Sequence, residues 1–427
     1  MAQFKTKAFE WLLKAAENGF TDAMFNLGVL YQDGDGVEQD FEKAFGWFLK
    51  AANNGNAMAM NIVGLWLSQG KGATQNETKA FEWWIKAAEK GNTNAIQSVG
   101  WCYDYGKGTT EDKTKAFEWY LKSADNGNAN GMYCVGWDYD NGEGVVQDKT
   151  KAFEWFLKAA NNGHEGGMLR VGLCYYNGEG VALDKAKAFQ WFLKSAEKGH
   201  VGAMHNVGVC YDKGEGVVQD AFKAFEWFLK AANNGFVDAM FNVGWAYGKG
   251  EGTAQSYTKA FEWYWKAANN GNVDAMFSVG LAYDKGEGVT QDKTKAFEWW
   301  LKSAENGCAP AMFNVGVCYS KGERVNEDKN KAFQWYLKAA NHGDTDAMCN
   351  VGAFYHNGEG VNEDKYKAFQ WYEKGAAMNH PLSVFYLGRC YFYGFGVGKD
   401  TGKAGQLFER AKALGCTETP PSQCMIQ

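Results

Sequence analysis

The chain has 427 residues, of which 46% are hydrophobic and 22% are charged, and its formal net charge is −6. This composition is typical of a folded, soluble protein, and the acidic balance argues against a nucleic-acid partner, which requires a basic surface. No apolar stretch is long enough to span a membrane, so we expect no direct membrane insertion. The N-terminal residues contain no hydrophobic signal segment. We therefore expect a cytoplasmic protein, or a secreted or periplasmic one if a leader has been removed.

A segment of 36 residues recurs along almost the whole chain without insertion or deletion. A period of this size indicates stacked supersecondary units, none of which can bury a core alone. Because each repeat contacts only its neighbours, we predict one continuous solenoid domain over residues 1–416. The marker of the repeat, Lys-Ala-Phe, begins at Lys7, Lys43, Lys79, Lys115, Lys151, Lys187, Lys223, Lys259, Lys295, Lys331 and Lys367, with a degenerate copy at Lys403.

The first half of each unit has the pattern of an amphipathic helix, called helix A below. In the first complete copy we predict this helix from about residue 22 to residue 33. Leu27 and Tyr31 belong to its apolar stripe, which has the spacing of one helix face. Thr21 or Asp22 is suited to be its N-cap, since a short polar side chain can accept a backbone hydrogen bond there.

The second half of the unit predicts another helix, called helix B. It runs from about residue 41 to residue 53, with Asp40 in the N-cap position. Ala44, Phe48 and Ala51 form its core stripe. Apolar residues cover more than half of its circumference, which is wider than a helix with one buried face needs. We therefore predict that helix B lies between its own helix A and helix A of the next unit.

The order of these patterns gives the organisation of the chain. It starts with a leading helix B over residues 4–18, and eleven A–B repeats follow from about residue 20 to residue 416. The last helix B is more polar than the others, as the end of an array requires. Residues 417–427 are expected to form a disordered tail.

A glycine recurs in the middle of helix A, where it costs about 1 kcal/mol relative to alanine. Something must offset this cost in every unit. The simplest cause is the close approach of a bulky ring from helix B, such as Phe48 or Trp84. This position is occupied by Gly28, Gly64, Gly100, Gly136, Gly172, Gly208, Gly244, Gly280, Gly316, Gly352 and Gly388.

The residue types that could carry chemistry do not form a catalytic or metal site. The loop glycines follow the C-terminus of helix A, whereas a phosphate cradle needs a helix N-terminus, so we interpret them as left-handed helix caps. Asp138, Asp140 and Glu143 lack the spacing of a calcium loop. His200 and His205 are five residues apart, which does not place them on one helix face. We predict no catalytic residue, no metal and no cofactor.

The ten cysteines are best interpreted as small buried residues in a reduced compartment. Five of them share one position of helix A, and none lies on helix B within the array. Equivalent positions of stacked helices are about 8–10 Å apart, which is too far for a disulfide.

The constant residues of the unit, taken together, define a family pattern. One copy reads Leu27-Gly28, Tyr31, Gly34, Gly36, Val37, Asp40, Lys43-Ala44, Trp47-Phe48, Lys50-Ala51-Ala52 and Gly55. Over roughly residues 4–416 this pattern resembles the Sel1-like repeat, a relative of the tetratricopeptide repeat. Single departures, such as Leu67 for the tyrosine and Arg324 for the second loop glycine, leave it intact. The resemblance implies an all-α fold, namely a right-handed α/α solenoid (superhelix) of helix–turn–helix repeats whose concave face is lined by helix A. It also implies a non-enzymatic scaffold or adaptor.

The position of a binding site follows from the contrast between constant and variable positions. The recurring tryptophan of helix B, Trp47 and its equivalents, is expected to serve packing. A ligand is not repetitive, so recognition should use outward helix A positions that change between repeats. Their mixture of aromatic and amide side chains suits a protein or peptide partner, because aromatic anchors carry most interface energy. The candidates are Trp101, Tyr133, Trp137, Arg170, His205, Phe241, Asn242, Trp245, Phe277, Phe313, Asn314, His356 and Arg389.

Several alternatives remain open at this stage. The same surface would suit a glycan, and the aromatic residues at 241, 277 and 313 could instead pack between neighbouring helices. The N-terminal helix has no cap, and Phe9, Trp11 and Leu12 would expose an apolar face. This favours a homo-oligomer that assembles head to tail. Cysteine-rich Sel1-like proteins have been proposed to bind or cleave β-lactams, but those carry disulfides between the two helices, which this sequence lacks the cysteines to form.

Overall fold

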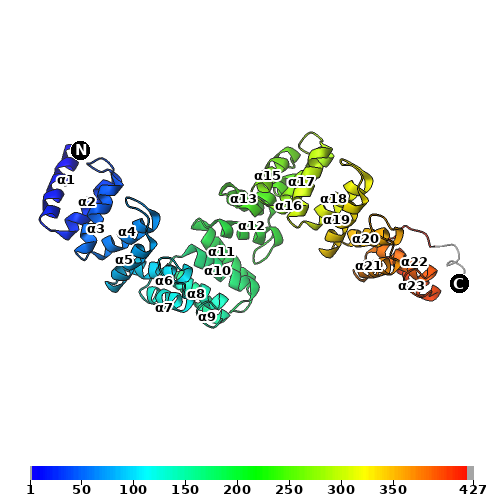
Figure 1. The fold of residues 1–427 in the computed structure, drawn as a ribbon, viewed down its shortest axis with the longest axis horizontal. Coiled ribbons are helices and arrows are strands. Elements are labelled where there is room, and N and C mark those ends of the chain that lie inside the picture. The colour runs from blue at the N-terminus through cyan, green and yellow to red at the C-terminus, as the bar shows by residue number, and fades with distance from the viewer. Residues whose placement is uncertain (1, 421–427) are drawn as a thin grey trace. The chain divides into compact units, whose positions relative to one another are not determined.

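The computed structural model describes residues 2–420, with side chains from residue 7 onward, and these residues form α-helices and no strand (Figure 1). The helices of type B are α1 (Ala2–Glu17), α3 (Phe41–Asn53), α5 (Glu77–Glu89), α7 (Lys113–Asp125), α9 (Lys149–Asn161), α11 (Lys185–Glu197), α13 (Ala221–Asn233), α15 (Tyr257–Asn269), α17 (Lys293–Glu305), α19 (Lys329–Asn341), α21 (Lys365–Ala377) and α23 (Thr401–Ala413). The helices of type A are α2 (Thr21–Asp33), α4 (Ala57–Gln69), α6 (Thr93–Tyr105), α8 (Ala129–Asn141), α10 (Glu165–Asn177), α12 (Val201–Lys213), α14 (Val237–Lys249), α16 (Val273–Lys285), α18 (Ala309–Lys321), α20 (Thr345–Asn357) and α22 (Pro381–Tyr393).

The chain divides into two compact units, Met1–Gln219 with helices α1–α12 and Asp220–Gln427 with helices α13–α23. Within each unit, each helix B that has a helix A on both sides packs against both of them, as its wide apolar surface predicts, and α1, α13 and α23 pack against the one helix A beside them. Repeated helix pairs of this kind confirm the predicted all-α solenoid fold. One continuous domain over residues 1–416 stays a prediction. Of the predicted tail, residues 417–420 have no regular structure, and residues 421–427 lie outside the described part of the chain.

The ends of the helices follow local capping chemistry. Helix α3 has the predicted bounds, and the Asp40 side chain accepts a hydrogen bond of 2.9 Å from the backbone N–H of Lys43. The predicted N-cap of the first helix A is wrong, because α2 already begins at Thr21. Phe20 occupies its N-cap position without a side-chain hydrogen bond. In the next repeat the equivalent residue, Asn56, does cap its helix by accepting from the Ala59 N–H.

The recurring glycine of helix A packs against a ring of helix B, as predicted. A Cβ added to Gly28 would lie 2.6 Å from the Phe48 ring, closer than any real contact of this kind. A residue with a side chain can therefore occupy this position only if the ring or one of the two helices moves. Added Cβ atoms would meet the corresponding ring at 2.4–2.8 Å at Gly28, Gly64, Gly100, Gly136, Gly172, Gly244, Gly280, Gly316, Gly352 and Gly388.

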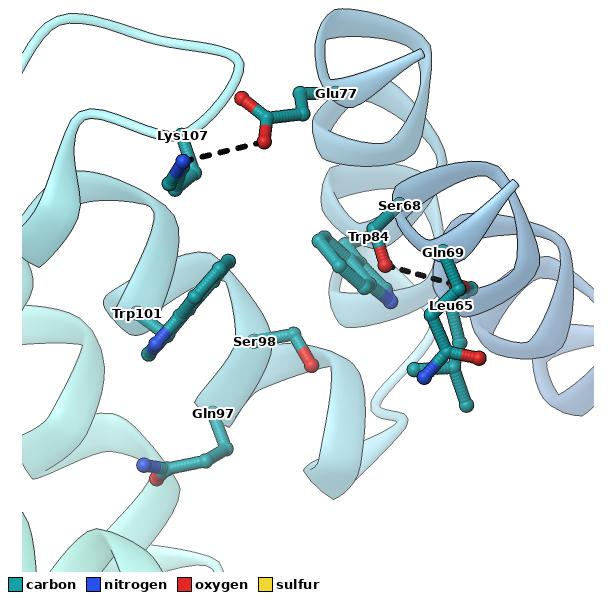
Figure 2. A pocket seen from close by; sticks show the side chains of 9 residues that line it. All are labelled: Leu65, Ser68, Gln69, Glu77, Trp84, Gln97, Ser98, Trp101 and Lys107. Atoms are coloured by element: carbon teal, nitrogen blue, oxygen red, sulfur yellow. Dashed lines mark hydrogen bonds and ion pairs between the residues drawn. The ribbon is translucent and has the colours of Figure 1, made fainter. Parts of the chain in front are cut away.

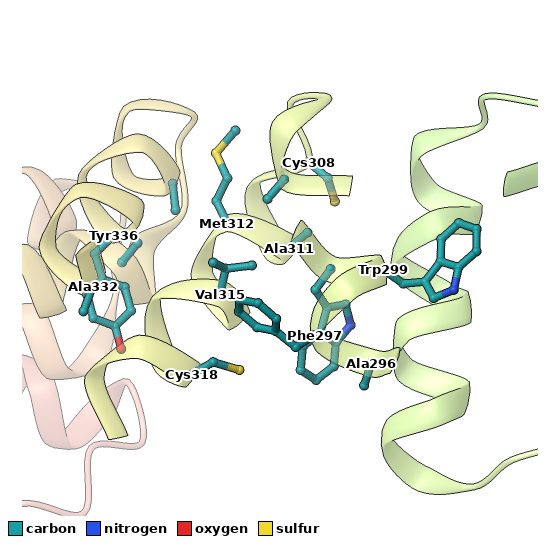
Figure 3. Close-up of a cluster of buried hydrophobic side chains, with 14 of the residues drawn as sticks. Ala296, Phe297, Trp299, Cys308, Ala311, Met312, Val315, Cys318, Ala332 and Tyr336 are labelled. Carbon is teal, nitrogen blue, oxygen red and sulfur yellow. The ribbon is translucent and has the colours of Figure 1, made fainter. Parts of the chain in front are cut away.

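Each residue of the Lys-Ala-Phe marker has its own contact. The Lys43 ammonium lies 5.7 Å from the ring centre of Tyr31 in the same repeat, and Ala44 is fully buried. The phenylalanine contacts the next repeat: the rings of Phe81 and Tyr103 meet edge to face at 5.4 Å. This aromatic pair recurs down both units and joins each helix B to the following helix A. Figure 3 shows part of the buried core of the second unit, in which the Phe297 ring points toward Val315 of the following helix A.

The recurring tryptophan of helix B is less buried than the sequence suggests. Trp155 is half-buried, and the Lys158 ammonium lies 3.7 Å from its ring centre. Its neighbour Phe156 is fully buried and is the ring that meets Gly136. Of the equivalent tryptophans, Trp299 is buried and Trp11 is exposed. The tryptophan therefore covers the edge of the core, and the ring after it forms the core.

The contact between the glycine and the ring can be tested by adding one methyl group. We expect Gly136→Ala to destabilise the first unit by about 1–3 kcal/mol, because the added Cβ forces Phe156 or helix α8 to move. The matched control is Gly46→Ala in α3, where an added Cβ has no neighbour within 4 Å. That change should stabilise the helix by about 0.5–1 kcal/mol. Urea denaturation measures both, and equal effects would contradict the assignment.

A second comparison separates the core ring from the tryptophan beside it. Deleting the side chain in Phe156→Ala should cost about 3–5 kcal/mol, as for a fully buried aromatic residue. Trp155→Ala should cost clearly less, because part of its surface already faces water. Thermal unfolding followed by circular dichroism measures the order of the two. A larger loss for Trp155→Ala would show that the tryptophan forms the core.

Candidate functional site

The structure divides the outward positions of helix A into two groups. Residues equivalent to Phe25 lean onto the core ring of their own repeat: the ring centres of Tyr133 and Phe156 are 5.7 Å apart, and those of Phe241 and Tyr264 are 5.6 Å apart. Residues equivalent to Val29 are more accessible. Three tryptophans at that position are 40–47% exposed, namely Trp101, Trp137 and Trp245.

A pocket of about 470 Å³ opens beside one of these tryptophans in the first unit (Figure 2). Leu65 and Ser68 of α4 form one wall, Trp101 of α6 forms the other, and the buried ring of Trp84 of α5 lies between them. At the rim the Lys107 ammonium is 3.3 Å from the Glu77 carboxylate. The pocket is thus aromatic and apolar inside, with an ion pair at its mouth. Its full lining is Leu65, Ser68, Gln69, Glu77, Trp84, Gln97, Ser98, Trp101 and Lys107.

The second unit has a pocket of about 210 Å³ at equivalent positions of the repeat. Here Ala353 and His356 of α20 face Tyr386 and Arg389 of α22, and the Tyr372 ring of α21 occupies the place of Trp84. The Arg389 guanidinium lies 5.6 Å from the Tyr386 ring centre. Because both pockets are built from the same positions, we name the feature the inter-repeat pocket. It lies between successive helices A, with the core ring of the intervening helix B beneath it.

Between α8 and α10 an arginine side chain of the protein itself occupies the region of the inter-repeat pocket. Arg170 of α10 pairs with the Asp140 carboxylate of α8. Its guanidinium lies 5.2 Å from the Trp137 ring centre and 5.1 Å from that of Phe156. The predicted site residues Trp137 and Arg170 are therefore brought together. They are already partnered with each other, whereas Trp101 faces an open pocket.

Arg324 occupies the equivalent region in the second unit, although it belongs to a different position of the repeat. It stands in the loop after α18, where the other repeats have a glycine, and its φ is 74°. Its guanidinium pairs with Asp284 of α16 and lies 5.1 Å from the Trp300 ring centre. It also approaches the Cys318 sulfur at 3.3 Å. Arginines from two different positions of the repeat, one in helix A and one in the loop after it, thus contact the same aspartate and ring positions.

Asp138 of α8 is a buried acid that the sequence does not single out as a site residue. It is 4% exposed, and its Oδ2 atom has no hydrogen-bond partner. Burial raises the pKa of its carboxyl to about 8, and the nearby charges of Asp104 and Glu143 act in the same direction while Lys113 opposes them. The signal available in the sequence is a departure from the repeat, because equivalent residues are cysteine, alanine or large apolar side chains.

The remaining predicted site residues are spread along both units. Tyr133 stacks on His164 with ring centres 4.6 Å apart, and His164 caps α10 by accepting from the Gly167 N–H. The other members of this group are half-buried residues of helix A, and they do not form one cluster. They are His205, Asn242, Phe277, Phe313 and Asn314, of which Phe277 and Phe313 pack against the core of the second unit.

Two further predictions concern His356 and the N-terminal helix. His356 lines the pocket of the second unit, where burial and the charges of Lys365 and Arg389 lower its pKa. On α1, Trp11 is 73% exposed, while Phe9 and Leu12 are half-buried. Self-association through this helix stays a prediction.

Within the described part of the chain, no three His, Cys, Asp or Glu side chains lie close enough together to bind a metal ion. The loop glycines are helix caps, as predicted: Gly34 has a φ of 71°, and its N–H donates to the Leu30 carbonyl. Among the nine free cysteines that the structure describes, seven are buried. None of the helices in residues 2–420 has the length and apolar character needed to traverse a lipid bilayer.

Comparison with known proteins identifies the class to which this fold belongs. A solved structure similar to it is a protective antigen present in uropathogenic Escherichia coli strains, described as displaying an SLR fold. It is 34% identical, with a TM-score of 0.80 over 96% of this chain and 88% of that one. A Sel1 repeat protein from Oxalobacter formigenes is 29% identical, with a TM-score of 0.58 over 72% of this chain and 89% of its own. Among curated proteins, none matches the chain.

The family follows from the repeats themselves. The chain belongs to the Sel1 repeat family, whose members are generally protein-interaction scaffolds. The family model, described as Sel1 repeat, matches residues 5–20, 21–56, 57–92, 94–128, 129–164, 166–200, 201–236, 237–272, 273–308, 309–344, 345–380 and 381–416.

The buried acid predicts an unusual dependence of stability on pH. The pKa of Asp138 is about 8 in the folded chain, against an ordinary value of 3.8. Between these values the unfolded chain has lost a proton that the folded chain keeps, so stability falls as the pH rises through this window. Asp138→Asn removes the titration. We expect the variant to gain stability over the wild type between pH 5 and pH 8, by up to about 1.4 kcal/mol per pH unit. Urea denaturation at several pH values would reveal a constant difference if Asp138 were ionised throughout.

Proposed function

We propose that this protein is a non-enzymatic scaffold that binds a protein or peptide partner along its helices A, through the inter-repeat pockets. The observation that supports this most is the recurrence of the pocket at equivalent positions in both units. An extended partner could place successive side chains in successive pockets. The constant residues of the repeat would set the spacing, and the variable residues of helix A would select the side chain.

The lining of the pocket in the first unit suits a peptide. Trp101 presents 40% of its surface, Leu65 presents 41%, and the wall between them is the buried Trp84 ring. Aromatic anchors in desolvated pockets carry most of the energy of protein interfaces. Ser68, Ser98 and Gln97 add hydroxyl and amide groups that can bond a peptide backbone, and the Gln97 Oε1 atom is buried without a partner.

The proposal predicts which tryptophans matter for binding. Peptides selected from a random phage-displayed library on the full chain should bind at least about tenfold more weakly to Trp101→Ala or Trp245→Ala, since loss of an interface anchor costs about 2 kcal/mol or more. The matched control is Trp265→Ala, because Trp265 is also an accessible tryptophan, at 38% exposed, but belongs to helix B. Biolayer interferometry measures the affinities, and circular dichroism confirms folding.

Two results would contradict the proposal. One is a set of selected peptides whose affinity is unchanged by both helix A substitutions. The other is a loss of affinity in Trp265→Ala as large as that in Trp245→Ala, which would place the binding surface on helix B.

A further inference from the structure

Two arginine side chains of the protein itself occupy the inter-repeat region. Arg170 and Arg324 start from different positions of the repeat, yet both guanidinium groups reach an aspartate equivalent to Gln32 and a ring equivalent to Phe48. These partners are Asp140 and Phe156 for the first arginine. For the second they are Asp284 and Trp300. The chain has only four arginines, and two of them bind the same combination of an aspartate and an aromatic ring. This combination therefore suits a guanidinium group.

The equivalent position between α6 and α8 has the aspartate and the aromatic ring but no arginine. Asp104 stands where Asp140 and Asp284 stand, and Tyr120 provides the ring, with its hydroxyl donating to Asp104 Oδ2 at 3.1 Å. The residue equivalent to Arg170 is Cys134, and the residue equivalent to Arg324 is Gly144. Neither can supply a cation.

This place also holds an additional carboxyl group. Asp138 is equivalent to Cys318, whose sulfur contacts the Arg324 guanidinium in its own repeat. At the same position Trp66 lies over the Phe48 ring, with centres 5.4 Å apart, so a side chain here rests on the ring of the preceding helix B. Asp138 accordingly stands at the Tyr120 ring, beside Asp104, and its Oδ2 atom has no partner.

The charges around Asp138 do not balance. Its neighbours are Asp104 on α6, Lys113 on α7 and Glu143 in the loop after α8. The Lys113 ammonium is engaged by Asp104 at 2.9 Å, by Glu111 at 3.6 Å and by Glu143 at 3.9 Å. With Asp138, four carboxyl groups therefore share one lysine. Asp138 avoids the cost of an unpaired buried carboxylate by keeping its proton up to a pH of about 8, and a cation that reached it would stabilise its ionised form.

We propose that the site between α6 and α8 binds the guanidinium group of an arginine side chain carried by the partner. This rests on the proposed function and names the chemistry of one partner residue. The guanidinium would take the place that Arg170 and Arg324 take in their own repeats, flat against the Tyr120 ring and paired with Asp104 and Asp138. Trp101 stands at the position of Trp137, whose ring the Arg170 guanidinium approaches at 5.2 Å, so we place it at the edge of this site; it also lines the adjacent pocket.

A guanidinium fits this site better than other cations do. Its planar fork can pair with two carboxylates and stack on a ring at the same time, which an ammonium group cannot do. A metal ion would need three or more close donors, and no such group occurs among the described residues. Lysines also pair with the two precedent aspartates, Lys149 with Asp140 and Lys293 with Asp284. The groups that reach both the aspartate and the core ring are nevertheless arginines, although lysine is ten times more frequent in the chain, at 40 of the 44 basic residues.

The test uses a small probe and the full chain, so that it does not depend on knowing the partner. The chain is labelled with 5-fluorotryptophan, the Trp101 resonance is assigned with Trp101→Phe, and N-acetyl-arginine amide is added while ¹⁹F spectra are recorded. We expect the Trp101 resonance to shift with arginine. It should not shift with N-acetyl-citrulline amide, which has the same shape without the charge. The lysine analogue should bind at least about tenfold more weakly than arginine.

Two variants locate the effect. Asp138→Asn should weaken arginine binding at least about tenfold, since it removes a charged hydrogen-bond partner. Cys134→Arg copies the arrangement of Arg170 and should fill the site from within, so the probe no longer shifts Trp101. Its thermal unfolding, followed by circular dichroism, shows that the variant is folded.

The outcomes distinguish the inference from the proposed function. The inference is overturned if arginine and citrulline shift Trp101 equally, if neither shifts it, if lysine matches arginine, or if Asp138→Asn binds as the wild type does. If that happens while selected peptides still depend on Trp101 and Trp245, the scaffold function stands without an arginine site. If arginine binds as expected but peptide binding does not depend on these tryptophans, the cation site stands and the proposed function fails.

Discussion

The structure depends on one steric constraint, the contact between the helix A glycine and a ring of helix B. An added Cβ at Gly136 would lie 2.7 Å from the Phe156 ring. The ring therefore occupies the volume that a side chain of helix A would fill, and the two helices approach closely. The same contact recurs along both units, in repeats of constant length. The same ring lies beneath the inter-repeat pocket, so the contact that sets the fold also builds the candidate site.

The backbone repeats, but a few side chains differ between repeats, so each region between successive helices A has different chemical properties. Between α4 and α6 the variable residues leave an open aromatic pocket. Between α8 and α10 the region is closed by Arg170, and in the second unit Arg324 closes another. Between α6 and α8 two aspartates remain beside a tyrosine. These differences arise from single substitutions at positions that face the pocket, while the backbone repeats.

Much of the fold can be predicted from the sequence because it depends on local and periodic signals. The 36-residue period, the Asp40 cap and the packing of Gly28 against Phe48 all follow from spacing, capping chemistry and the cost of a mid-helix glycine. The sequence places the helix A cap one or two residues too late, at Thr21 or Asp22, because Phe20 takes the N-cap position without a cap bond and no propensity favours it. The sequence predicts that the recurring tryptophan serves packing, but it does not show that a lysine three residues later lies over its ring, as Lys158 does over Trp155.

The site was predicted only in part, since its lining comes from three helices. The sequence identifies Trp101, His356 and Arg389 as outward residues, and these do line pockets. It does not reveal that Trp84 forms the wall beside Trp101, or that Arg170 is already paired with Asp140. Those contacts depend on side-chain directions between repeats. Asp138 and Arg324 could have been noticed as departures from the repeat, although their convergence on one kind of site needs the coordinates.

The central claim is that partners bind along helices A, in the pockets above the core rings. A crystal structure of the full chain with a peptide selected on it tests this most directly. The account predicts a peptide that crosses α4 and α6 and places a side chain beside Trp101 and Trp84. A peptide bound to the outer surface of the B helices, with that pocket empty, would contradict it.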